Sequence, residues 1–161
     1  MKLSTITPDR DLAQAGVWRD FGPEIDGEQM RLLIAWNGNE HFMEKQARLL
    51  RNATQQMAGR DLPQETQTKI QRKAMAGTIL LGWENWDEED GSGKIPDHLE
   101  DGSFNEYAAI MLLENQMVHQ FVALASNRVE DFQKVEDAAS KAAMKRGAAV
   151  ESEVGQPTQA A

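Results

Sequence analysis

Two short runs of apolar and aromatic residues near the start of the chain predict a β-hairpin. The runs span residues 17–21 and 30–36, and the segment GPEIDG at 22–27 separates them. Glycine and proline supply turn geometry, so we expect the runs to pair as antiparallel strands over residues 16–36. The preceding residues 1–15 are mostly polar and are expected to form a short lead-in. An isolated hairpin is marginally stable in water, so this one must lie on helices or pair its edge with another chain.

Apolar residues at helical spacing follow the hairpin and predict two antiparallel helices. Asn39 is placed to cap a first helix over residues 40–58, whose apolar side chains gather on one side. Gly59 ends that helix, and Pro63 suits the first turn of a second one. Because the connecting loop is short, we expect the two helices to pack against each other.

The stretch AMAGTILLGWENW at residues 74–86 continues the second helix and is interpreted as the centre of the fold. From Thr78 onward the one-sided periodicity is lost, and Ile79, Leu80 and Trp83 would point to different sides of a helix. A helix that is apolar on all sides must be covered by protein. We therefore expect a central helix that the other elements enclose.

Two more helices are predicted within residues 103–125. Ser103 and Glu106 have the S-x-x-E spacing of a capping box and precede a run of apolar residues. One continuous helix would place the charged Glu114 in the middle of its apolar face. We therefore expect a break at this position, with Asn115 capping the second helix.

The last predicted helix begins at a capping-box-like pair, Asn127 and Glu130, and becomes rich in alanine before it ends near Gly147. The small and polar residues of 147–161 are expected to form a disordered tail. The sequence as a whole predicts a mainly α (α+β) fold of about five helices with a short N-terminal β-hairpin. A chain of 161 residues suits one domain, here residues 16–146 with its helical part at 40–146.

Composition excludes several classes of protein. The chain has no cysteine, which rules out disulfides, thiolate nucleophiles and cysteine-based zinc sites. It lacks the run of about 20 apolar residues that spans a bilayer, and its first residues form no hydrophobic signal core. We therefore expect no membrane partner and a cytoplasmic location. The net charge of −9 argues against a nucleic-acid partner, because such binding depends mainly on neutralising phosphates.

Charge is distributed unevenly along the chain. Residues 84–106 contain nine acids and one base, a balance of −8. Residues 40–76 contain seven bases and four acids, a balance of +3. The simplest interpretation of the acidic segment is a solvated loop between helices whose surfaces carry mixed charge.

Known catalytic and ligand-binding motifs do not occur in this sequence. The acidic loop at 87–91 resembles a calcium site in composition, but both registers of an EF-hand loop fail, since an apolar residue would occupy a ligand position. The histidines His41, His98 and His119 lack the spacing of a metal site. Phosphate-binding, dinucleotide-binding and nucleophile-elbow motifs are also absent. We therefore predict no catalytic residue, metal or cofactor.

The order of these features resembles the tail assembly chaperones of long-tailed, siphovirus-like bacteriophages. Four blocks carry the resemblance and cover most of residues 16–132: GVW at 16–18, RLLIA with GNEHF at 31–42, A-x-x-x-TILLGWENW at 74–86, and FV-x-x-ASNR-x-x-DF at 121–132. The third block is the most characteristic, because its L-L-x-W run precedes an acidic turn and an Ile-Pro pair. None of the blocks is a catalytic signature, so the similarity is one of pattern.

The resemblance implies a protein that is not an enzyme. Chaperones of this family hold the long, helical tape measure protein in solution while tail tube subunits assemble around it, and they are absent from the finished virion. The implied partners are the tape measure protein and, as a further candidate, the tail tube protein, in the cytoplasm of the bacterial host. Self-association through the edge of the hairpin is an additional candidate contact.

The candidate partner-binding residues combine the predicted helices over 104–125 with the tryptophan end of the central segment. They are Trp83, Trp86, Phe104, Tyr107, Met111, Met117 and Phe121. Tryptophan anchors many interfaces, and methionine adapts to varied partners. The alternative for the tryptophans, Trp36 included, is that they close the core where elements end. The alternative for the methionines, Met111 and Met117 included, is that they pack within the core.

Two other functions stay open at this point. One is a structural minor tail or head-tail connector subunit that remains in the virion. The other is a small acidic regulator that binds a basic protein through residues 84–106. Binding by such a regulator would fade as salt rises, because salt screens exposed charges, whereas apolar chaperone contacts would persist.

Overall fold

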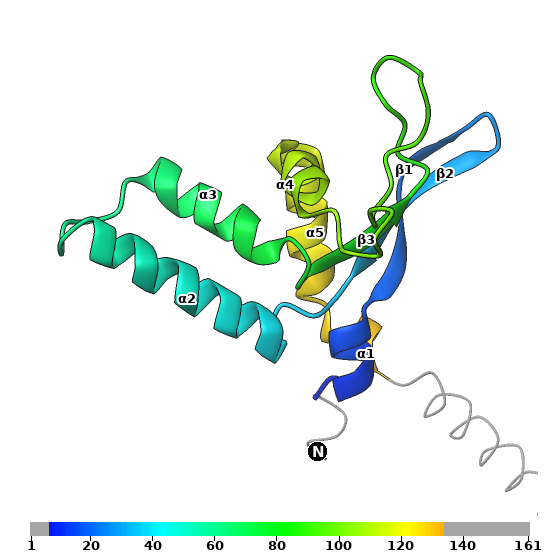
Figure 1. Cartoon of the computed structure of the whole chain (residues 1–161). Helices are drawn as coiled ribbons and strands as arrows, with labels where there is room; N and C mark the ends of the chain where they lie inside the picture. The colour runs from blue at the N-terminus through cyan, green and yellow to red at the C-terminus, as the bar shows by residue number, and fades with distance from the viewer. Residues whose placement is uncertain (1–6, 134–161) are drawn as a thin grey trace, which may run out of the picture.

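The computed structural model describes residues 7–133, which form a three-stranded sheet, helices packed beside it and a helical arm that projects from it (Figure 1). In chain order the elements are α1 (Arg10–Ala15), β1 (Val17–Ile25), β2 (Glu28–Ile34), α2 (Glu40–Gln56), α3 (Gln64–Met75), β3 (Leu80–Glu84), α4 (Glu106–Glu114), α5 (Gln116–Ser126) and the 3₁₀ helix η2 (Val129–Phe132). Five α-helices with an N-terminal hairpin confirm the predicted mainly α (α+β) class.

The predicted β-hairpin is confirmed and is part of a larger sheet. β2 pairs antiparallel with both β1 and β3, so the strand order is β1-β2-β3. The turn of the hairpin lies at Asp26 and Gly27, which both have positive φ values of 53° and 77°. Such a two-residue turn has a twist that matches the twist of the paired strands. The turn is therefore shorter than the predicted segment 22–27, and β1 extends through most of that segment.

The central segment 74–86 contains the end of a helix, a turn and a strand, which corrects the prediction of a continuous helix. α3 ends at Met75, and the chain resumes as β3 after the turn. Gly77 in this turn has a φ of +79°, and a Cβ there would lie 3.2 Å from the ring of Phe104. An apolar run without a polar face fits a buried strand as well as a buried helix, so periodicity cannot separate the two. The segment is nevertheless central, because Leu80 is fully buried.

α2 and α3 form the predicted antiparallel pair and extend side by side away from the sheet (Figure 1). We call this pair the arm. Asn39 caps α2 as predicted, since its side-chain oxygen accepts a hydrogen bond from the Phe42 N–H at 3.0 Å. Pro63 lies at the N-cap of α3, directly before its first turn. Phe42 is the single buried residue of α2, so the arm meets the core mainly at its base.

The predicted break between two C-terminal helices is confirmed. α4 ends at Glu114, and the side chain of Asn115 accepts hydrogen bonds from the first backbone N–H groups of α5 at 3.0 and 3.2 Å. The predicted capping box at the start of α4 is wrong. Asn105 caps this helix instead, whereas the Ser103 hydroxyl donates to Asp101. The side chain of Glu106 is held in an ion pair with α2, so it does not fold back onto a capping residue.

Both ends of the described chain depart from the prediction. The expected lead-in contains α1, which Asp9 caps through hydrogen bonds from two backbone N–H groups. The predicted final helix begins as the short 3₁₀ helix η2, and the Asp9 N–H donates to the Phe132 carbonyl at 2.8 Å. The remainder of that predicted helix and the predicted disordered tail lie outside the described residues.

One hydrophobic core joins the sheet to α4 and α5. Its largest fully buried side chains are Leu32, Ile34, Ile79, Leu80, Leu113 and Val122. They come from two strands, two helices and the turn that precedes β3. The core therefore depends on the tertiary arrangement of short elements, since none of these elements has enough apolar surface to be stable alone.

Replacement of Asn39 tests how much the hydrogen bonds at the base of the arm contribute to the stability of the fold. We expect Asn39→Ala to lower the free energy of unfolding by about 2 kcal/mol, because it removes a helix cap and leaves the Thr78 carbonyl without the amide that donates to it. Asn39→Asp keeps the cap acceptor and should cost less. Urea unfolding checks both, with Asn52→Ala on the exposed side of α2 as the matched control. A loss for Asn39→Ala no larger than that of the control would contradict the expectation.

Candidate partner-binding surface

The structure divides the seven candidate residues between the core and the surface. Trp83 is buried, with 3% of its surface exposed. Trp86, Phe104 and Phe121 are half-buried. The exposed members are Tyr107, Met111 and Met117, with exposed fractions of 77%, 44% and 69%.

Trp83 is the centre of an aromatic cluster at the end of β3. Its ring meets those of Trp86 and Phe104 edge to face, with centroid separations of 5.6 and 5.9 Å. The indole N–H donates to the Ile95 carbonyl at 2.8 Å, which holds the acidic loop against the sheet. Edge-to-face pairs of this kind stabilise a fold beyond simple burial. The position of Trp83 matches the interpretation in which tryptophans close the core.

Phe121 packs α5 against the sheet. Its ring lies 5.2 Å from that of Phe21 on β1, again in an edge-to-face arrangement. Phe121 is therefore a packing residue in this conformation, and its aromatic ring is only partly available to another protein.

The remaining candidates face solvent on α4 and α5. Tyr107 and Met111 lie one turn apart on α4. On α5, Met117 is followed two turns later by Leu124, which is 71% exposed and was not predicted. The seven-residue spacing of this pair is the sequence signal that could have found it. We call these four residues the α4–α5 surface.

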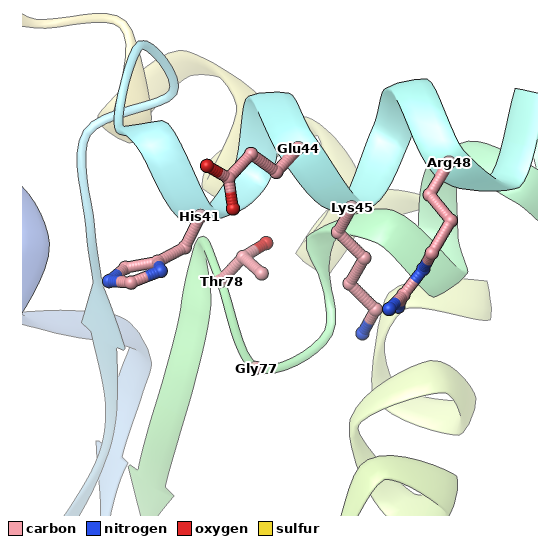
Figure 2. A pocket seen from close by; sticks show the side chains of 6 residues that line it. All are labelled: His41, Glu44, Lys45, Arg48, Gly77 and Thr78. Atoms are coloured by element: carbon pink, nitrogen blue, oxygen red, sulfur yellow. The ribbon is translucent and has the colours of Figure 1, made fainter.

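A polar recess lies between α2 and the turn after α3 (Figure 2). It has a volume of about 440 Å³ and is lined by His41, Glu44, Lys45, Arg48, Gly77 and Thr78. The Lys45 ammonium donates to the Ala76 carbonyl at 2.7 Å and to Glu106 at 3.2 Å, and the Thr78 hydroxyl donates to the Ala74 carbonyl. These groups serve the attachment of the arm. In residues 7–133 no cluster of three or more His, Asp or Glu side chains could hold a metal ion.

His119 lies half-buried on the inner side of α5, and its Nδ1 atom is buried without a hydrogen bond. Burial lowers the pKa of this imidazole, and the positive charge of Arg72 on α3 lowers it further, against a smaller opposite effect of the Leu113 carbonyl. The neutral form of His119 is therefore the form that suits the packed helices.

Comparison with models of known protein families finds a match. A family model described as YdaY prophage protein matches residues 37–146, which is more than half of the chain. No curated protein and no solved structure matches. The matched region includes the arm, β3, the aromatic cluster and the α4–α5 surface. Within the described part of the chain, no helix is both long enough and apolar enough to cross a membrane.

The shifted pKa of His119 predicts a dependence of stability on pH. Below its ordinary value of 6.5 the unfolded chain takes up a proton at this side chain more readily than the folded chain does. The free energy of unfolding should therefore fall as pH drops through about 6.5, and His119→Gln should flatten that fall. Urea unfolding at a series of pH values measures the slope, with His41→Gln on the exposed face of α2 as the control. An unchanged slope in His119→Gln would refute this origin.

Proposed function

The chain belongs to the YdaY prophage protein family, and we propose that this phage-derived protein is a tail assembly chaperone that binds the tape measure protein and keeps it in solution during assembly of the tail tube. Membership of the family is the evidence for a prophage origin. The tape measure protein is proposed as the partner because the sequence resembles the tail assembly chaperones.

The observation that carries the proposal is the exposed α4–α5 surface. Four large apolar side chains on two adjacent helices lie open to solvent, two of them methionines. Exposed apolar groups of this kind favour contact with another protein, and methionine adapts to partners of varied shape. A chaperone of a long, aggregation-prone helical protein needs such a surface.

The charge of the chain supports the same role. Its net charge of −9 favours solubility of any complex that it forms, because like-charged particles repel each other. We further propose that the protein acts in the cytoplasm of the bacterial host, where the tail proteins are made. The tail tube protein is a second proposed partner.

Co-expression tests the proposal. The chain is produced together with the large coiled-coil protein encoded beside it, and the soluble fraction and a pull-down are compared with and without it. We expect the large protein to become soluble and to co-purify. Met117→Ser combined with Leu124→Ser should reduce recovery several-fold, because the changes remove exposed apolar surface that a bound partner would cover. Met43→Ser with Leu50→Ser, on the arm, is the control.

The contrary result is also clear. If the large protein stays insoluble and unbound while the chain is found in purified particles, the chain is a structural subunit of the virion. That outcome would replace the chaperone with a minor tail or head-tail connector role.

A further inference from the structure

The α4–α5 surface lies in a segment with a one-sided charge. Residues 95–127 contain five acids and no lysine or arginine. The acids are Asp97, Glu100, Asp101, Glu106 and Glu114. The same segment contains five of the eight large apolar side chains that are exposed in the described chain, namely Leu99 and the four residues of the α4–α5 surface. Apolar exposure and negative charge therefore occur together.

Most of this negative charge is not neutralised by neighbouring cations. Glu106 pairs with Lys45 at 3.2 Å, and Asp97 lies 3.0 Å from the imidazole of His98. Among residues 7–133, Glu100, Asp101 and Glu114 form no ion pair with a lysine or arginine. Glu114 lies three residues after Met111 on α4 and therefore borders the same face of that helix. Glu100 and Asp101 lie in the loop that leads to α4. A partner that covers Tyr107 and Met111 thus meets the Glu114 carboxylate beside them.

We propose that the α4–α5 surface binds a partner helix whose apolar stripe is bordered by lysine and arginine. A stripe of apolar residues at helical spacing would cover the methionines, Tyr107 and Leu124, while its basic borders would face the carboxylates. Carboxylates next to an apolar surface discriminate against a partner with acidic borders, because like charges brought together raise the free energy of binding. The inference deepens the proposed function, on which it rests, by naming the chemistry of the bound segment.

The two exposed pairs each form an apolar ridge along a helix, and this shape suits contact with a helix of the partner. Tyr107 and Met111 are four residues apart and Met117 and Leu124 are seven apart, which corresponds to ridges of about 6 and about 10 Å along a helix. Ridges of side chains on one helix can pack into the grooves between the side chains of a second helix. Methionine side chains on both ridges allow the fit to adjust.

Two synthetic peptides test the charge of the partner. Both are 18-residue amphipathic helices with leucines at the same positions; one has lysine and the other glutamate at the remaining positions. Fluorescence anisotropy with the full chain measures binding of each. We expect the lysine peptide to bind at least about tenfold more tightly, and the difference to shrink as salt rises from 50 to 500 mM, because exposed charges are then screened. Equal binding of the two peptides would overturn the inference.

Variants locate the binding. Tyr107→Ser, Met111→Ser, Met117→Ser and Leu124→Ser together should weaken binding of the lysine peptide at least about tenfold, since they remove the apolar contact. Ile25→Ser with Met43→Ser and Leu50→Ser removes exposed apolar side chains elsewhere and should leave binding unchanged. Circular dichroism confirms that each variant is folded. Equal losses in the two sets would overturn the inference.

Matched charge changes exclude a simple effect of net charge. Glu100→Gln, Asp101→Asn and Glu114→Gln together should weaken binding of the lysine peptide several-fold. Glu88→Gln, Glu89→Gln and Asp90→Asn remove the same number of charges from the tip of the acidic loop and should have a smaller effect. A larger effect of the loop variant would move the binding to that loop and refute the proposal.

Two further measurements separate this inference from its alternatives. Sedimentation of the chain alone, with and without the four substitutions of the α4–α5 surface, tests a second copy as the occupant. A dimer that these substitutions dissociate would overturn the inference. Recovery of the tape measure protein is scored independently. If the tape measure protein co-purifies but the two peptides bind equally, the chaperone role stands and the inference fails. If the lysine peptide binds more tightly but the tape measure protein does not co-purify, the preference of the surface for a basic helix stands and the chaperone role is refuted.

Discussion

One buried carboxamide determines how the arm is attached to the sheet. Asn39, 4% exposed, accepts from the Phe42 N–H and donates to the carbonyls of Trp36 and Thr78. It thereby joins the end of β2, the start of α2 and the turn between α3 and β3. Unpaired polar groups at this depth would be costly, so all three segments must meet in one arrangement. Lys45 adds a second link by bonding the same turn and α4.

The fixed turn has consequences for the rest of the fold. Because α3 ends directly before it, β3 enters the sheet beside β2, and Trp83 arrives where its indole can hold the acidic loop. The loop returns the chain to α4, which the Lys45–Glu106 pair and the buried Leu113 place on the core. The exposed side chains of α4 and α5 are therefore presented on a packed support, which limits the conformational entropy that a partner must remove on binding.

Local signals along the chain were sufficient for several elements. Asn39 and Asn115 cap the helices that the sequence assigned to them, because a helix start depends on neighbouring residues. β3 could not be distinguished from a helix, since its apolar run has no polar face, and its pairing with β2 is a contact between distant parts of the chain. The exposure of the candidate site residues likewise depends on contacts between distant parts of the chain. Two of the predicted residues, Met111 and Met117, are exposed, yet the burial of Trp83 and the exposure of Leu124 follow from tertiary packing that no local pattern records.

The attachment of the arm also determines where the molecule tolerates alteration. The buried side chains of α2 and α3 are Phe42, Ala74 and Met75, all at its base, whereas Ala58 and Gly59 at its tip are exposed and have positive φ. The outer turns of the arm are therefore held by the contact of two helices alone, so they can open and close without disturbing the core. A fluorophore or an affinity tag inserted at this tip would leave both the aromatic cluster and the α4–α5 helices undisturbed.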